Sequence, residues 1–222
     1  MKHNLKMRIP LLLLIFVSSS LVKTLAQDYF IGGMLGYSIP TNIGNSEEYG
    51  FKDYADKGWE VAAVGKWFYQ QNLSLGYHIG YQFQAEGEIW DVDRYGDVSA
   101  SYQTFRLLLN GAYYFSQDEI RPYLGLSFGA YYMINTMDFD ASSATNKSVA
   151  YTAKEWKPGI APQVGVLLEL SKKTMLDCKL QMDLVAHMEP TVVIDPDYGA
   201  VTQNPHGNQN QFSFSVALIF GL

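Results

Sequence analysis

A two-residue alternation between Leu73 and Glu86 constrains the fold of this chain more than any other feature. The odd positions of this segment are all apolar or aromatic, whereas the even positions carry only Ser, Gly, His, Gln or Glu. Successive side chains point to opposite faces of a β-strand, whereas one face of a helix recurs about every 3.6 residues. The segment is therefore predicted to be a β-strand with one apolar and one polar face.

The same pattern recurs, less regularly, along the rest of the chain. The eight predicted strands cover approximately residues 29–39, 59–69, 73–86, 104–115, 123–132, 156–170, 176–187 and 211–222. Short connections at 70–72, 116–120 and 171–174 alternate with long ones at 40–57, 87–100, 136–155 and 190–210. This alternation is typical of an up-and-down meander. We expect one domain over residues 27–222, with both termini at the rim of the tight turns.

The first 26 residues have the organisation of an export signal. Lys2, Lys6 and Arg8 precede an apolar run at residues 9–17, and small residues lead to a predicted cleavage site after Ala26. The run is far shorter than the roughly 20 residues of a spanning helix, although an uncleaved anchor helix is the alternative. Residues 27–222 then hold twelve basic and 22 acidic residues, a net charge of -10. This charge argues against a nucleic-acid partner.

Two architectures fit eight amphipathic strands. A secreted lipocalin-like barrel places its apolar face inside, whereas a membrane barrel places it outside. An eight-stranded barrel is just wide enough inside to be filled by side chains. The apolar face is rich in Trp, Tyr, Phe and Leu, which are too bulky for that space, whereas Gly, Ser, Ala, Thr and Gln dominate the other face. We predict an all-β, eight-stranded antiparallel up-and-down transmembrane β-barrel whose apolar face contacts lipid.

The polar face also carries charges of both signs. A basic residue facing lipid near the bilayer midplane would cost roughly 2–4 kcal/mol, but opposite charges inside a closed barrel can pair. We expect a cross-strand network that fills the lumen, with a narrow regulated passage as the alternative. The network residues are predicted to be Glu60, Lys66, His78, Arg106, Lys157, Glu169, Lys179 and Asp183.

Aromatic residues gather beside the short connections. Such residues form interfacial girdles in membrane barrels. The predicted girdle consists of Trp67, Tyr69, Tyr113, Phe115, Tyr123 and Phe220.

Together, the export signal, the eight strands, the alternating connections and a strand that ends at the C-terminus resemble the small outer-membrane β-barrel family. That family includes the OmpX, OmpW and OmpA-barrel types, and its last strand carries a signal for the barrel-assembly machinery. Ser215, Phe220 and Leu222 match this signal, whereas Ala217 stands where Gly is usual and Leu222 where Phe is commoner. The resemblance implies assembly into the outer membrane of a Gram-negative-type cell. Short turns and both termini would then be periplasmic.

The long connections carry most of the acidic residues, and we expect any specific activity there. Residues 91–97 and 195–199 superficially resemble calcium loops, but Tyr95 and Tyr102 occupy the fifth and twelfth positions of the first loop. Beside anionic lipopolysaccharide, only weak binding of a divalent cation is expected. The acidic residues are Glu47, Glu48, Asp53, Asp56, Glu86, Glu88, Asp91, Asp93, Asp97, Asp138, Asp140, Asp195 and Asp197.

No recognisable catalytic constellation accompanies these loops. His187 and His206 flank the fourth long connection, and Ser213 and Ser215 follow it, but their spacing indicates no nucleophile and base. We therefore predict a monomeric, non-enzymatic barrel without a cofactor, in contact with outer-membrane lipid and lipopolysaccharide. Its expected role is structural or surface-interacting. A transport barrel for small apolar solutes or a narrow porin-like channel is the main alternative; a lipid-modifying enzyme and a soluble lipocalin-like barrel are the lesser ones.

Overall fold

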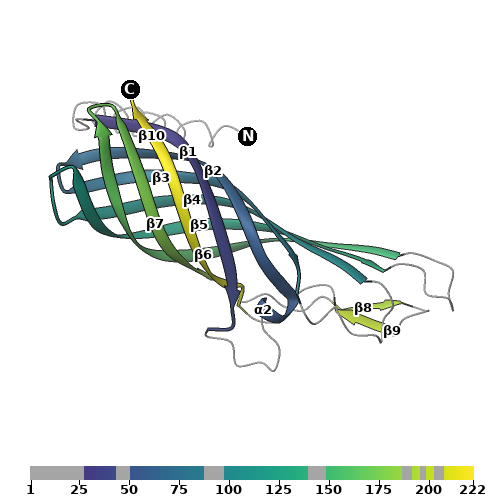
Figure 1. Ribbon diagram of the computed structural model, residues 1–222. Coiled ribbons are helices and arrows are strands. Elements are labelled where there is room, and N and C mark those ends of the chain that lie inside the picture. The colour runs from purple at the N-terminus through teal and green to yellow at the C-terminus, as the bar shows by residue number, and fades with distance from the viewer. Residues whose placement is uncertain are drawn as a thin grey trace, which may run out of the picture.

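The protein folds into a closed antiparallel barrel of eight strands (Figure 1). The computed structural model describes residues 28–43, 51–87, 98–139, 149–186, 192–195, 199–202 and 208–222. The barrel strands are β1 (Asp28–Thr41), β2 (Ala55–Gln70), β3 (Leu73–Glu86), β4 (Val98–Tyr114), β5 (Ile120–Phe139), β6 (Val149–Ser171), β7 (Thr174–Val185) and β10 (Asn210–Gly221). Consecutive barrel strands pair with each other, and β10 closes the barrel against β1. The predicted fold class is confirmed. The predicted export signal lies outside the described residues.

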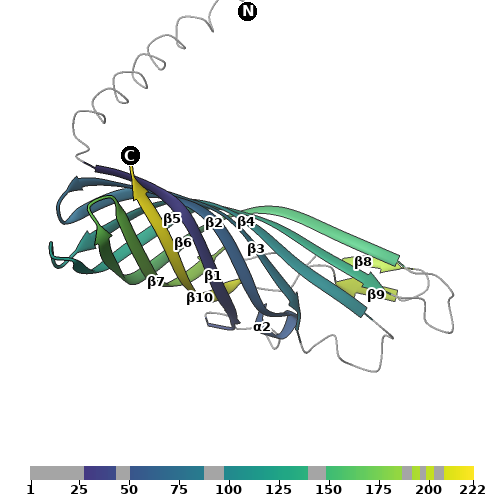
Figure 2. The ribbon, with the colours of Figure 1, turned by 45° about the horizontal axis from the view of Figure 1, so that its top comes forward.

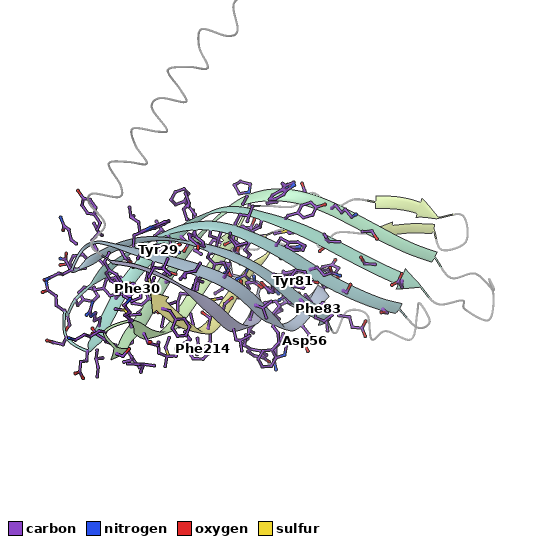
Figure 3. The ribbon with its side chains drawn as sticks, turned by 90° about the horizontal axis from the view of Figure 1, so that it is seen from above. Tyr29, Phe30, Asp56, Tyr81, Phe83 and Phe214 are labelled. Atoms are coloured by element: carbon purple, nitrogen blue, oxygen red, sulfur yellow. The ribbon has the colours of Figure 1, made fainter. Side chains whose placement is uncertain are left out.

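The two-residue alternation decides which side chains enter the barrel. In β3, the outward Ile79 is 53% exposed, whereas the adjacent His78 is 2% exposed. Large apolar side chains cover the outer wall in the same way on every barrel strand, as Phe83 and Phe214 illustrate (Figure 3). A closed sheet leaves no unpaired backbone edge in hydrocarbon, and a continuous apolar band outside it is the wall of a transmembrane barrel.

Aromatic side chains mark the two borders of the apolar band. Three strands carry outward aromatic residues eight positions apart: Tyr29 and Tyr37 in β1, Trp59 and Trp67 in β2, and Phe105 and Tyr113 in β4. The rings of neighbouring strands contact each other. Those of Tyr29 and Trp67 are tilted, with centroids 5.1 Å apart, and those of Tyr37 and Trp59 meet edge to face, with centroids 5.0 Å apart. Eight residues span about 26 Å along a strand, or about 20 Å of membrane at a tilt of roughly 40°.

The prediction that Tyr123 belongs to the aromatic girdle is wrong. Tyr123 is 1% exposed and points into the lumen, because it has the parity of the inward residues of β5. The hydrophobicity of a tyrosine does not reveal its face, but its position in the alternation does.

Strands β4, β5 and β6 project well beyond the others at the end of the long connections (Figures 1 and 2). β5 and β6 stay paired as far as Phe139 and Val149, although residues 136–155 were expected to be a loop. On the opposite side, β7 pairs with β6 only from Gly159 onward. Within the part of the chain that the structure describes, residues 149–157 of β6 therefore pair with β5 alone.

Two of the long connections contain small elements of their own. The helix α2 (Phe51–Tyr54) is anchored by Asn42, whose Nδ2 donates to Asp53 at 3.0 Å and whose Oδ1 accepts from the Lys52 amide at 3.2 Å. β8 (Val192–Asp195) and β9 (Gly199–Thr202) form a separate two-stranded sheet. No helix among the described segments is long and apolar enough to cross a membrane.

The C-terminus lies at the end of the barrel that carries the tight turns. The amide of Gly221 donates to the carbonyl of Lys173 in the β6–β7 turn at 2.8 Å, and the amide of Leu222 donates to the carbonyl of Tyr29 at 3.0 Å. The start of β1 and the end of β10 thus meet at this rim (Figure 1).

Candidate functional site

The centre of the lumen is an ionic cluster around Arg106 on β4. Its guanidinium is fully buried and donates from Nη1 to Glu60 Oε2 at 3.0 Å, while Nη2 lies 3.2 Å from Asp183 Oδ2. Arg106 also donates to the side-chain oxygen of Gln82. Glu60 contacts His78 through its other oxygen, at 2.7 Å. Strands β2, β3, β4 and β7 are thereby joined across the lumen.

Asp183 collects several neutral donors in addition to Arg106. The Tyr131 hydroxyl donates to Oδ1 at 2.8 Å and Gln181 Nε2 donates to the same oxygen at 2.6 Å. Ser213 donates to Oδ2 at 3.2 Å, and Gln211 Nε2 lies 3.4 Å from that atom. A buried carboxylate is stable only when such partners replace its water, and both oxygens of Asp183 have them. Elsewhere in the cluster, Arg106 Nε, His78 Nδ1 and Gln181 Oε1 have no hydrogen-bond partner among the described residues.

A second ionic pair lies closer to the turn end. Lys66 Nζ is 2.7 Å from Asp177 Oδ2, and the Tyr123 hydroxyl donates to Oδ1 of the same carboxylate at 2.8 Å. The ammonium of Lys66 also lies 5.0 Å from the centroid of the Tyr123 ring and 5.7 Å from that of Tyr114, within the range of a cation–π contact. Asp177 was missing from the predicted network, although it has the parity of the inward residues Lys179 and Asp183.

Lys179 lies between these two clusters. Its side chain lines a cavity of about 20 Å³ together with Lys66, His78 and Gln163, which is room for one water molecule. It interacts electrostatically with Asp177 and Glu60. The three lumen carboxylates of these clusters, Glu60, Asp177 and Asp183, are thus equal in number to the basic side chains Lys66, Arg106 and Lys179, of which Lys66 and Arg106 form ion pairs.

The remaining predicted network residues lie elsewhere. Lys157 pairs with Glu155 at 2.5 Å near the loop end of β6, and Glu169 pairs with Arg121 at 2.6 Å near its turn end. Both pairs are partly exposed. Alternation predicts the face of a strand on which a side chain lies but not its height along the barrel, so the pattern does not distinguish these residues from the central ones.

Apolar side chains lie in the lumen on either side of the ionic clusters. At the turn end, the inward-facing cluster includes Phe30, Phe68 and Met175, and a vestibule of about 260 Å³ ends on these three residues. At the loop end, Phe51 of α2 is 2% exposed and packs edge-on against Tyr102, with centroids 6.0 Å apart. The polar-face composition emphasised Gly, Ser and Gln and did not reveal these plugs.

The hydrogen-bond ladder between β6 and β7 is incomplete near the loop end. The Ala186 amide donates to the Pro158 carbonyl at 3.1 Å, so Pro158 and residues of its parity face β7. Pro158 and Pro162 therefore withhold two ladder donors from β7, and pairing is interrupted between Ile160 and Gln163. An apolar groove of about 670 Å³, lined by Pro158, Ile160 and Val185 among others, follows this seam.

The structure places only some of the other predicted residues, namely those of the assembly signal and a few of the loop carboxylates. Ser215 is buried in the lumen, whereas Phe220 and Leu222 are exposed on the outer side at the turn end; their role as an assembly signal stays a prediction. His187, His206 and the majority of the loop carboxylates lie outside the described residues. Among the described residues, no group of three or more His, Cys, Asp or Glu could hold a metal ion.

The fold is similar to that of several solved bacterial membrane barrels. Neisserial surface protein A matches with a TM-score of 0.51 and 10% identity, over 86% of this chain and 96% of that chain. Outer membrane protein OprG from Pseudomonas aeruginosa matches with a TM-score of 0.56 and 14% identity, over 89% of this chain and 96% of that chain. A major outer membrane protein from Thermus thermophilus matches with a TM-score of 0.54 and 16% identity, over 88% of this chain and 99% of that chain.

Searches with protein-family models and against curated proteins give no match. At identities this low, the structural likeness concerns the fold. The chain has the fold of the small eight-stranded outer-membrane β-barrels.

Proposed function

We propose that the protein is an integral barrel of a bacterial outer membrane with a sealed lumen, and that it acts structurally and through contacts at the cell surface. The observation that carries this proposal is the fully buried Arg106 cluster, which ties four strands together across the lumen. Apolar plugs lie on both sides of it. A conducting pore needs an open polar path, and the buried cluster with apolar residues on either side of it argues against such a path.

The placement in the membrane follows from the outer wall. Its apolar band and aromatic borders suit a lipid bilayer, and Phe220 and Leu222 point outward where an assembly machinery could read them. The tight turns and both termini would face the periplasm. The long connections and the projecting sheet would then lie outside, beside lipopolysaccharide, where a weak divalent cation could bridge carboxylates. We take the working unit to be a monomer without enzymatic activity.

Planar-bilayer recording tests the sealed lumen. We expect no openings from the purified protein under conditions in which a general porin conducts. A variant with Arg106→Ala, Glu60→Ala, Asp183→Ala and Phe68→Ala should conduct, because it removes the central cluster and part of the turn-end plug. Substrate-sensitive openings of the unmodified protein would refute the proposal.

The membrane placement has a separate and simpler test. After detergent extraction, a folded barrel should migrate on a gel differently before and after boiling. Fractionation should recover the protein with outer membranes. A processed chain that stays in the aqueous phase without detergent would instead support the soluble lipocalin-like alternative.

A second candidate function, transport of small apolar solutes, is favoured by the groove at the β6–β7 seam. The test is uptake of an apolar dye into liposomes that contain the protein. Pro158→Val with Pro162→Val supplies the missing donors and should slow such uptake, with Pro40→Val as the control substitution elsewhere. If uptake equals that of protein-free liposomes, transport through this seam is excluded.

A further inference from the structure

The vestibule at the turn end of the lumen has the composition of a small-molecule site. Its volume is about 260 Å³, and its floor consists of the inward-facing Phe30, Phe68 and Met175, which are 3%, 5% and 4% exposed. Ligand pockets of proteins start at about 300 Å³ and combine an apolar lining with a few placed polar groups. The vestibule therefore suits a small molecule or the end of a chain.

Arg121 on β5 forms part of the wall of this vestibule. Its Nε donates to the carbonyl of Asp118 at 2.9 Å, and its Nη2 donates to Glu169 Oε2 at 2.6 Å. The guanidinium also lies over the Phe68 ring, 5.9 Å from its centroid. These contacts fix the guanidinium, whereas its Nη1 makes no hydrogen bond with any residue that the structure describes. A positioned guanidinium with a free donor is suited to a carboxylate.

The charged residues of the lining are unequal in number. Lys172, in the β6–β7 turn, lines the vestibule together with Arg121, and Glu169 is the one carboxylate among the described residues that line it. A ligand with a single negative charge would balance this set. It would also accept hydrogen bonds from ionised donors, which are roughly twice as strong as those from neutral ones.

Three amide side chains from two other turns complete the rim. They are Gln70 and Gln71, at the β2–β3 turn, and Gln117, at the β4–β5 turn. An amide side chain both donates and accepts hydrogen bonds, so this part of the rim suits an amide group of a ligand. The lining thus matches three ligand features, which are an apolar portion, an amide and a negative charge.

We propose that the vestibule binds a small N-acylated carboxylate with an apolar side chain, the chemistry found at the carboxyl end of a peptide. The carboxylate is held by Arg121 and Lys172, and the acyl amide meets the glutamine side chains. The apolar side chain lies on Phe30 and Met175. In the orientation proposed above, the ligand would come from the periplasm, but binding itself does not depend on that orientation.

Methyl NMR of the protein in nanodiscs, with isotope-labelled methionine methyl groups, tests the proposal. Met175 reports on the floor of the vestibule, and Met133, which packs with Leu108 and Tyr131 in a separate apolar cluster, is the internal reference. The probe is N-acetylleucine. It should shift the Met175 signal with a Kd in the millimolar range, as is usual for so small a ligand, and leave the Met133 signal unchanged.

Two related compounds test the ligand chemistry. N-acetylglycine lacks the apolar side chain, and N-acetylleucinamide lacks the carboxylate. Each should bind about tenfold more weakly than N-acetylleucine, because one loses the burial of a side chain on the floor and the other loses charge-assisted hydrogen bonds at the rim.

Two lysines of the same turn provide a matched pair of variants. Lys172 and Lys173 are both exposed, but only Lys172 is among the residues that line the vestibule. Lys172→Gln should raise the Kd of N-acetylleucine about two- to fivefold, as for other exposed ion pairs, whereas Lys173→Gln should not change it. Arg121→Gln should raise the Kd about tenfold or more, and an unchanged Met133 signal would show that this variant is folded.

Three results would overturn the proposal. They are an unshifted Met175 signal at about 50 mM N-acetylleucine, equal Kd values for N-acetylleucine and either related compound, and equal effects of Lys172→Gln and Lys173→Gln. The bilayer recordings use no ligand, so a failed vestibule site is distinguishable from a failed sealed-lumen proposal.

Discussion

Replacing Arg106 by Met should destabilise the barrel more than any other single change in the lumen. The guanidinium lies 3.0 Å from Glu60 and 3.2 Å from Asp183, and at an effective dielectric constant of about 20 each contact corresponds to about 5 kcal/mol of Coulomb attraction. Most of this offsets the cost of removing the charges from water. Truncation nevertheless leaves two buried carboxylates without their cation, and we expect a loss of about 3–5 kcal/mol.

A double-variant cycle separates charge from packing. Arg106→Met combined with Asp183→Asn removes one charge of each sign, so the double variant should lose about 2 kcal/mol less than the sum of the two single losses. Lys157→Met is the control, since its pair with Glu155 is partly exposed and should contribute less than about 1 kcal/mol.

The assay is urea unfolding in detergent micelles, followed by tryptophan fluorescence and by the shift on unboiled gels. Linear extrapolation gives the free energy of unfolding for each variant. A loss below about 1 kcal/mol for Arg106→Met, or additivity of the two single losses within about 0.5 kcal/mol, would refute the assignment of Arg106 as the charge that holds the lumen together.

Three further predictions use the same unfolding assay. Gly80→Ala should cost about 1–3 kcal/mol, because its Cβ would lie 2.5 Å from a carboxylate oxygen of the central cluster; Gly33→Ala, which meets nothing within 4 Å, is its control, and equal effects would contradict the packing described. Leu109→Arg, midway between the aromatic borders on β4, should cost roughly 2–4 kcal/mol, whereas Phe115→Arg at the turn rim should cost about 0–1 kcal/mol; the reverse order would place the membrane wrongly. Tyr131→Phe removes a donor to a buried carboxylate and should cost about 1.5–3 kcal/mol, and an unchanged stability would show that water replaces the hydroxyl.

The sequence predicted the barrel because alternation is a local property of each strand. The faces of Ile79 and His78 follow from parity alone, and so do the inward positions of Arg106 and Asp183. Strand ends were less well predicted. β5 continues to Phe139 and β6 already begins at Val149, because pairing between two strands can extend beyond the barrel without any change in composition.

The pairing of charges could not be read from the sequence. It depends on strand stagger, which brings Lys66 opposite Asp177 and sends Glu169 to Arg121 at the turn end. The apolar plugs were also missed, because inward Phe30 and Phe68 break the polar pattern of their face. Parity would have identified Asp177 and Tyr123 as lumen residues.

The lumen contacts also constrain the order in which the barrel is built. Lys66 and Asp177 are 111 residues apart in the chain, and Gln82 and Gln211 are 129 apart. Contacts of such high sequence separation form late. Glu60, His78 and Arg106 lie on the neighbouring strands β2, β3 and β4, but Lys66 and Gln82 cannot meet their partners until β7 and β10 arrive. Until then they must stay hydrated, which means that the growing sheet carries a water-filled concave face. Closure of β10 against β1 and expulsion of that water are therefore one event, and the final strand determines when the interior becomes dry.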